Sequence, residues 1–188
     1  MYPFVKLTDD MITLRPYEFG DENNLHKAVQ ESLPELKPWM TWANESYSSE
    51  TARNFITLTR AYWSSGAMYA FAITDTQSGE FLGSCSLSHI HPIYQFCNLG
   101  YWVRTSQRGK GIAGRAAKLT ARFAFEKVKL IRAEIVIAVG NEASLRVAKK
   151  AGAHDEGILL NRMIIRTQIC DAYMFSLLPS DFGLVAQL

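Results

Sequence analysis

The sequence lacks the features of a disulfide-stabilised, membrane-spanning or nucleic-acid-binding protein. Its three cysteines (Cys85, Cys97 and Cys170) are an odd number without CxxC spacing, which argues against a disulfide framework and a zinc site and favours a reducing compartment. No apolar run is long enough to cross a bilayer, and no basic segment followed by an apolar one marks a signal peptide. The formal net charge is only +2, without a long run of one sign, so neither nucleic acid nor a membrane is expected as a partner. A cytoplasmic location is predicted.

The composition is that of a globular protein, and the 188 residues predict a single domain over residues 1–188. Hairpin-spaced runs predict three adjacent antiparallel strands, and strand-like runs on either side of one helical stripe predict a βαβ crossover. The pattern therefore predicts a mixed α/β (α+β) fold with a mostly antiparallel sheet flanked by helices. Strands are expected over residues 11–15, 68–74, 81–90, 96–103, 131–139, 158–165 and 171–178.

Local signals predict where the first two helices begin and end. Asp21 is placed to cap one helix, and Ser48 or Ser49 is placed to cap the next. Pro34 is expected to break the first helix, because proline lacks the N–H that an interior helical position requires. The tryptophans of residues 38–42 are therefore expected on a loop or a short turn.

A glycine-rich stretch at residues 107–114 separates the strand 96–103 from a helix that begins at Ile112. Glycine allows backbone N–H groups to approach a ligand without a Cβ in the way. The start of the helix adds unpaired N–H donors and a partial positive charge, and Arg108 and Lys110 add two cations. A strand, a glycine loop and a helix start in this order predict a site for a phosphate or a diphosphate.

A dinucleotide is one alternative ligand, because the three glycines spell GxGxxG and Glu134 follows at about the distance of a ribose-binding acid. Three observations count against it. Hairpin-spaced strands precede the loop, residues 104–107 separate the strand from the first glycine, and Glu134 stands inside a strand. A Walker A loop is absent, since no Lys-Ser or Lys-Thr pair follows the glycines.

Several motifs resemble the GNAT superfamily of N-acetyltransferases, in an order that covers nearly the whole chain. Arg108-x-x-Gly111-x-Ala113 after a strand looks like the loop with which this family binds the diphosphate of acetyl-CoA. Asn141-x-x-Ser144 and further segments resemble the RimJ/RimL branch, which acetylates α-amino groups of ribosomal and other proteins. The further segments are Ile-Thr-Leu-Arg-Pro at 12–16, Pro-Trp-Met-Thr-Trp at 38–42, Leu-Gly-Tyr-Trp-Val at 99–103 and Lys-Ala-Gly-Ala at 150–153.

The resemblance implies the GNAT fold with a central pair of splayed strands. It also implies acetyl transfer from acetyl-CoA to a primary amine, by direct attack and without a metal, with a protein N-terminus as the preferred acceptor. The pantetheine arm would lie in the gap between the strands, where a main-chain N–H near Trp102–Val103 faces the thioester oxygen. The protein is expected to be a monomer or a homodimer. The implied contacts with acetyl-CoA come from Trp102, Val103, Arg108, Gly109, Lys110, Gly111, Ile112, Ala113, Asn141 and Ser144.

The catalytic proton donor departs from the general pattern of the superfamily. Many members have a tyrosine seven positions after the asparagine, where this chain has Ala148. In the RimJ/RimL branch the serine of Asn-x-x-Ser is the usual substitute, so the resemblance assigns the role of acid to Ser144. Helix capping is the simpler interpretation of the pair, with Asn141 at the N-cap. One asparagine side chain can cap the helix and contact coenzyme A.

The general base is the second role for which this chain departs from the family pattern, because relatives often carry an acidic residue where this chain has Asn98. His89 and His91 are the candidates taken from the residues, with His89 preferred, since the unperturbed pKa of histidine, about 6.5, suits a base. His89 and His91 could also be a metal pair, but no carboxylate or cysteine stands close by to complete a site. Deprotonation of the amine through water is the competing account.

Aromatic residues are the candidates for the acceptor groove, with core packing as the alternative interpretation. Trp39, Trp42 and Tyr69 are predicted to line it. Glu31, Glu35 and Glu45 could attract the amine, but solvated surface charges are the simpler interpretation. Two further functions remain open: acetylation of a small amine such as a polyamine or an antibiotic, and a CoA-binding regulatory module without turnover.

Overall fold

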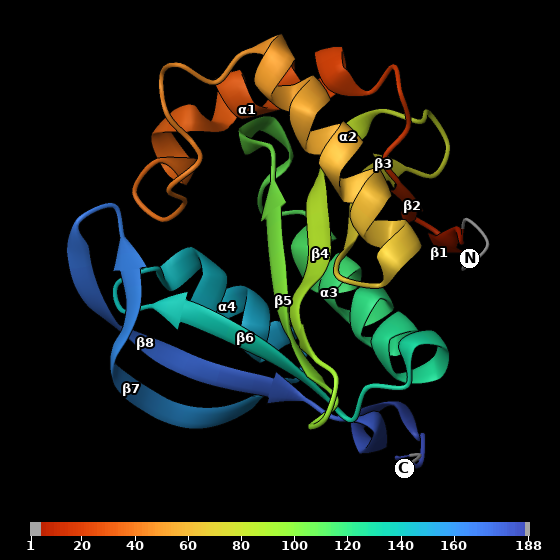
Figure 1. Ribbon diagram of the computed structural model, residues 1–188, viewed down its shortest axis with the longest axis vertical. Coiled ribbons are helices and arrows are strands. Elements are labelled where there is room, and N and C mark those ends of the chain that lie inside the picture. Colours follow the sequence, from red (N-terminus) through yellow and green to blue (C-terminus); the bar gives the residue numbers. More distant parts are fainter. Residues whose placement is uncertain (1–4, 187–188) are drawn as a thin grey trace.

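A computed structural model describes residues 5–186, and its strands form one eight-stranded sheet in the order β1-β2-β3-β4-β5-β6-β8-β7 (Figure 1). Every neighbouring pair among the described strands is antiparallel except β5 and β6, which are parallel and joined through a helix. The predicted fold class is confirmed. The strands are β1 (Leu7–Thr8), β2 (Ile12–Pro16), β3 (Tyr69–Asp75), β4 (Phe81–His91), β5 (Phe96–Val103), β6 (Arg132–Ala138), β7 (His154–Ile165) and β8 (Gln168–Leu177). Residues 1–4 and 187–188 of the predicted domain lie outside the described part.

The helices cover both faces of the sheet, and α1 and α2 lie side by side at the top of the view in Figure 1. They are α1 (Glu22–Leu36), α2 (Ser49–Ser65), α3 (Ile112–Phe123) and α4 (Glu142–Lys150), with shorter helical segments η1 (Thr105–Gln107), η2 (Ala124–Val128) and η3 (Pro179–Phe182). Among the described residues, no helix is both long and apolar enough to cross a membrane.

Strand β3 is buried on both faces, because helices pack on either side of it. Ala70 and Ala72 belong to the apolar cluster under α1 and α2, where small side chains allow the helices to come close. Phe71 points the other way, because side chains alternate along a strand. Its ring meets the ring of Phe123 from α3 edge to face, with centroids 5.3 Å apart. The sheet therefore separates two cores.

The ends of the helices match the sequence signals, except near Asp21 and Pro34. Ser48 caps α2 as predicted, with its side chain accepting from the Thr51 N–H. Asp21 stands at the N-cap of α1, but its carboxylate instead accepts two hydrogen bonds from Arg15, at 2.6 and 2.7 Å. The prediction that Pro34 breaks α1 is wrong, since the helix continues to Leu36. Because Pro34 lies in the last turn, its missing N–H removes only one terminal hydrogen bond.

The parallel pair β5–β6 separates after a short contact. Its register joins Phe96–Asn98 to Arg132–Glu134 and stops there. Beyond Asn98, β5 continues to Val103 along β4, while β6 turns away and pairs with β8. Figure 1 shows the two strands diverging below α1. The gap between them is the splayed pair that the family resemblance implied, and it opens next to the glycine-rich loop.

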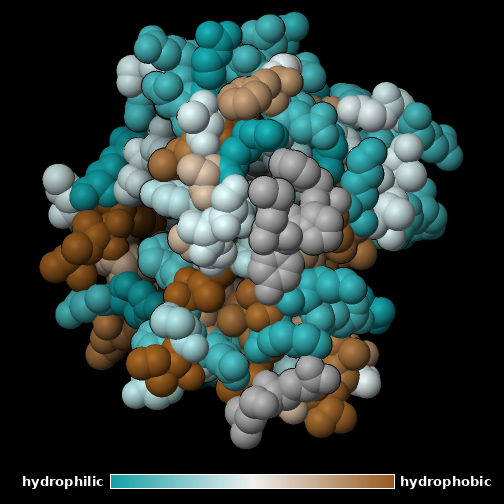
Figure 2. Space-filling view, turned by 45° about the vertical axis from the view of Figure 1, so that its right-hand side comes forward, coloured by the Kyte–Doolittle hydropathy of each residue, from teal (hydrophilic) through white to brown (hydrophobic). Residues whose placement is uncertain are grey.

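The β7–β8 hairpin is the most exposed part of the sheet, and β7 lies at its edge. Hydrophobic residues at its surface include Leu160, Ile164 and Ile169, with exposed fractions of 77%, 67% and 66%. In the space-filling view, hydrophilic residues cover most of the upper part of the face shown, whereas hydrophobic residues reach the surface mainly below (Figure 2). Strand β7 therefore contributes little to the two cores, whereas Phe175 and Leu177 of β8 are buried in one of them.

Candidate active site

The glycine-rich loop has the backbone of an anion site. Gly109 and Gly111 have φ angles of +79° and +80°, and Gly111 is the N-cap of α3 without a side-chain cap. A Cβ at either position would have no atom within 4 Å, so the space above the loop is open. Within residues 5–186, no hydrogen bond uses the backbone N–H groups of residues 109–114. These donors can therefore receive the oxygens of a diphosphate.

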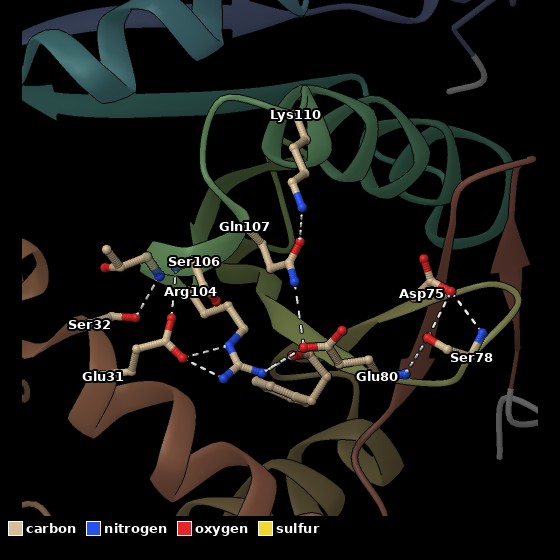
Figure 3. A network of polar contacts seen from close by, with 11 residues as sticks. Glu31, Ser32, Asp75, Ser78, Glu80, Arg104, Ser106, Gln107 and Lys110 are labelled. Atoms are coloured by element: carbon tan, nitrogen blue, oxygen red, sulfur yellow. Dashed lines mark hydrogen bonds and ion pairs between the residues drawn. The ribbon is translucent and has the colours of Figure 1, made fainter.

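Two cations flank these N–H donors, and the buried side chain of Ile112 anchors the loop that carries the donors. The Arg108 guanidinium lies 3.8 Å from the Glu35 carboxylate, while the Lys110 ammonium donates to Gln107 at 2.7 Å (Figure 3). The side chain of Ile112 is 4% exposed and packs into the core beneath the loop. Ile112 can therefore serve a ligand only through its backbone.

The alternation of β5 decides which backbone groups face the gap. Gln95 accepts from Ile131 toward β6, whereas Arg104 donates to Leu82 toward β4. Because the direction alternates along a strand, odd-numbered residues face β6 and even-numbered residues face β4. The N–H groups of Tyr101 and Val103 therefore point into the gap, and that of Trp102 points toward β4.

The start of α4 meets β5 on one side of the gap. Asn141 is the N-cap of α4 and accepts from the Ser144 N–H at 3.1 Å, so the capping interpretation is correct. The Tyr101 hydroxyl lies 3.2 Å from Ser144 Oγ and 3.2 Å from the Ser144 carbonyl. Burial raises the pKa of Tyr101 to about 12, so this phenol keeps its proton at neutral pH. The Tyr101 side chain therefore places a second hydroxyl group beside that of Ser144. The sequence analysis gave Tyr101 no role.

The signal for Tyr101 was present in the sequence, since it is the tyrosine of the Leu-Gly-Tyr-Trp motif. What the sequence did not contain is the contact with Ser144, which stands 43 residues later. Only the parallel crossover brings the two hydroxyls together.

Two of the three predicted acceptor aromatics lie at the mouth of the gap. The Trp39 ring comes within 3.7 Å of the Cβ position of Gly140, directly before Asn141. Trp42 is 41% exposed and lies against Trp102 of β5, with ring centroids 6.1 Å apart. Both belong to the loop between α1 and α2, as predicted.

Tyr69, the third predicted acceptor residue, lies in the hydrophobic core. Its side chain is 2% exposed and meets the rings of Trp63 and Phe123 edge to face, with centroids 4.8 and 5.3 Å apart. The cause is its odd position in β3, which points it to the α3 side of the sheet. A ring enclosed in this way cannot line an open groove, so Tyr69 is excluded from the site.

An opening of about 500 Å³ lies between the end of α1 and the turn of the β7–β8 hairpin. Arg166 of this turn donates to the Lys37 carbonyl at 3.1 Å and so joins the hairpin to α1. The opening is lined by Pro34, Lys37, Pro38, Ile165, Arg166, Thr167 and Gln168. It therefore has two cations and no carboxylate in its wall, and one of the cations, Lys37, forms an ion pair with Glu45 beside the opening.

His89 lies away from these groups. It has φ +50° at an irregularity of β4, is exposed, and bonds to Ser88 through its ring. Tyr101 pairs with Cys85, four residues along β4 from His89, which corresponds to about 13 Å of strand. The structure does not bring His89 to Ser144.

A carboxylate does stand at the gap, on a residue that sequence reasoning considered only as a ribose ligand. Glu134 of β6 is the register partner of Asn98, at the point where the strands separate. Its carboxylate accepts from Arg132 at 2.9 Å.

Two of the three cysteines lie in the core, and the described residues contain no cluster of metal ligands. No group of three or more His, Cys, Asp or Glu among them could hold a metal ion. Cys85 and Cys97 are buried, and burial raises the pKa of both thiols to about 12. Both pack as small core residues, and neither is available as a nucleophile.

The acetyltransferase (GNAT) domain profile matches residues 11–154. The chain belongs to the GNAT acetyltransferase family. It is therefore an acetyl-CoA-dependent N-acetyltransferase. Two similar proteins come from Bacillus subtilis (strain 168). "Putative ribosomal N-acetyltransferase YdaF" is 28% identical over 95% of this chain and 97% of its own length. "Probable N-acetyltransferase YjcK" is 31% identical over 90% of this chain and 95% of its own length.

Solved structures share the fold of this GNAT protein. RimL, the ribosomal L7/L12 α-N-protein acetyltransferase in complex with coenzyme A, superimposes with a TM-score of 0.84 at 21% identity. The match covers 93% of this chain and 98% of RimL.

Proposed function

We propose that this N-acetyltransferase acetylates the α-amino group of protein N-termini. The observation that carries the proposal is the opening between α1 and the β7–β8 turn, whose wall contains Lys37 and Arg166 and no Asp or Glu, while the Glu45 carboxylate forms an ion pair with Lys37 beside it. A polyamine or an aminoglycoside carries several positive charges, and a site for it needs carboxylates to replace water around each one. An N-terminal peptide brings one amine and a largely neutral backbone, which this opening suits better.

The resemblance to YdaF and RimL supports the same acceptor, since both names state a ribosomal substrate. An α-amino group also suits a site with a weak base. Its pKa of roughly 7.7–8.0 leaves part of it neutral at pH 7, whereas a lysine side chain with a pKa of about 10.4 is almost wholly protonated. Only the neutral amine can attack a thioester.

In the proposed complex the diphosphate of acetyl-CoA lies on the N–H groups of residues 109–114, with Arg108 and Lys110 beside it. The pantetheine arm follows the open edge of β5 into the gap, where the Asn141 side chain can reach it. The N–H of Val103 is the donor that we assign to the thioester oxygen. As the amine attacks, negative charge grows on that oxygen, and a donor held in place stabilises it.

The amine nitrogen forms a bond to the acetyl carbon, the carbon–sulfur bond breaks, and the sulfur leaves as a thiolate. Ser144 donates its hydroxyl proton to the thiolate and then regains a proton from water, and the Tyr101 hydroxyl, 3.2 Å from both oxygens of Ser144, holds that side chain in place. The nitrogen loses its proton to water. His89 stands too far along β4 to be our choice of base, and Glu134, whose register partner Asn98 is about 10 Å of strand from Tyr101, can receive the proton only through water.

We further propose that residues 1–188 form one domain in the cytoplasm, as a monomer or a homodimer. The continuous sheet supports a single domain, because it includes every strand from Leu7 to Leu177. Light scattering measures the oligomeric state directly.

An acceptor screen tests the proposed substrate. The release of free thiol from acetyl-CoA is measured with a peptide that has a free N-terminus, the same peptide acetylated at its N-terminus, spermidine and an aminoglycoside. We expect kcat/KM to be highest for the free peptide and turnover of the acetylated peptide to be absent. A higher kcat/KM for spermidine or the aminoglycoside would replace the protein acceptor with a small amine. If the protein binds coenzyme A but releases no thiol from acetyl-CoA with any of these acceptors, the result would indicate a regulatory module.

A further inference from the structure

One face of α1 is bonded to the segment that opens the glycine-rich loop. Glu31, Ser32 and Glu35 share this face, because residues one turn apart in a helix are neighbours. Ser32 is fully buried, and its Oγ accepts from the Thr105 N–H at 3.0 Å. The Glu35 carboxylate accepts from the Thr105 hydroxyl, also at 3.0 Å. The segment η1 is therefore fixed to a helix that stands more than 70 residues earlier in the chain.

Glu31 is the centre of these bonds (Figure 3). Its carboxylate accepts from Arg104 Nε at 2.9 Å and from a second nitrogen of the same guanidinium. The other oxygen accepts from the Ser106 N–H at 2.7 Å. The hydrogen bonds from Arg104 are the largest cause that lowers the pKa of Glu31 to about 2. Arg104 also reaches Glu80 at 3.0 Å, so the guanidinium is held from two sides.

Glu35 faces a different cation from the one that Glu31 binds. One of its oxygens faces the Arg108 guanidinium at 3.8 Å, on side chains that are 37% and 47% exposed. Arg108 is the cation that begins the glycine-rich loop. A carboxylate at this distance attracts Arg108 and repels a diphosphate that approaches the same guanidinium.

We propose that Glu31 and Glu35 are positioning residues that set the affinity for coenzyme A in opposite directions. Glu31 holds the loop in the shape that presents its N–H groups, whereas Glu35 competes with the diphosphate for Arg108. The inference rests on the proposed role of the loop. Sequence alone favoured solvated charges at both positions, and the contacts of this structure assign them to the donor site.

The test measures the affinity for coenzyme A, by calorimetric titration, in two variants. Glu31→Gln replaces one acceptor oxygen by an NH2 group that faces other donors, so we expect binding to weaken about tenfold. In Glu35→Gln the amide oxygen can still accept from Thr105, but the negative charge is gone. We expect binding to tighten about threefold at low salt, and the gain to shrink as salt screens the pair.

Glu126→Gln is the matched control, because Glu126 forms an exposed ion pair with Arg122 at 3.7 Å on another helix. Its affinity for coenzyme A should equal that of the wild type. Acetylpantetheine, a donor without a diphosphate, is the second control, and its KM should be the same in all variants. If Glu31→Gln does not fold, Arg104→Lys tests the same bond, since lysine keeps the charge and loses the planar fork.

Wild-type affinity in Glu31→Gln would overturn the inference, and so would unchanged or weaker binding in Glu35→Gln. Equal changes with acetyl-CoA and acetylpantetheine would also overturn it, because the effect would not involve the diphosphate. Failure of the wild type to bind coenzyme A would remove the proposed function as well, which separates the two conclusions.

Discussion

The two sides of the gap differ in how tightly their residues are held. On the side that we propose for acetyl-CoA, the segment that opens the glycine-rich loop bonds to α1 through Glu31, Ser32 and Glu35. On the side that we propose for the acceptor, the exposed turn of the β7–β8 hairpin reaches α1 through Arg166 and the Lys37 carbonyl. The comparison indicates a site with a fixed geometry for one ligand and a more open approach for the other. Such a division suits an enzyme whose donor is always the same molecule.

The largest effect is expected from Gly111→Val. Gly111 has a φ of +80°, which a β-branched residue does not adopt without strain, and the new side chain would enter the diphosphate site. We expect binding of coenzyme A to weaken at least about a hundredfold. Calorimetric titration measures the loss.

Gly79→Val is the matched control for this change. Gly79 has a φ of +74° and open space around its Cβ position, but it lies in the turn between β3 and β4. Gly79→Val should lower thermal stability about as much as Gly111→Val does, and it should leave the affinity for coenzyme A unchanged. Equal losses of affinity in the two variants would contradict the role of the loop.

The next effect is expected at the two hydroxyls on α4 and β5. Ser144→Ala should lower kcat about ten- to a hundredfold, with little change in the affinity for coenzyme A. Tyr101→Phe should lower kcat less, because it removes the partner of Ser144 and not the donor itself. Steady-state kinetics gives both values.

The double variant decides whether the hydroxyls act together. If Tyr101 acts through Ser144, adding Tyr101→Phe to Ser144→Ala should cause no further loss of kcat. Additive losses would show that the two groups act independently.

A smaller effect is expected on the acceptor side, from Trp42→Ala. The ring is 41% exposed beside Trp102, so its loss should raise KM for a peptide acceptor about fivefold and leave the KM for acetyl-CoA unchanged. Phe19→Ala is the control, since Phe19 is 64% exposed and packs on Arg60 near the start of α1. A higher KM for acetyl-CoA in Trp42→Ala would contradict the division between the two sides.

The smallest effect is expected from His89→Ala, which should leave the dependence of kcat/KM on pH unchanged. Glu134→Gln is the comparison, and it should lower kcat/KM or shift its pH dependence if this carboxylate receives the proton through water. A pH–rate profile altered by His89→Ala alone would make His89 the base. If neither variant loses activity, bulk water remains the acceptor of the proton.

Much of the fold could be predicted from local signals. The hairpin spacing of β3, β4 and β5, the glycine-rich loop and the Asn141 cap all depend on residues close together in the chain. At Tyr69, where the prediction was wrong, a longer-range effect decided. Tyr69 has the same aromatic chemistry as Trp42, but its register in β3 places it in the core.

The sequence by itself determined that a strand, a glycine loop and a helix start follow one another, because the required φ angles and the helix period are local properties. It also carried the motifs that mark the GNAT family. Only the tertiary structure decided the contact of Tyr101 with Ser144, the bonds from Glu31 to the loop and the separation of His89 from the gap. The physical reason is that these relations depend on strand order and register, which no short stretch of sequence contains.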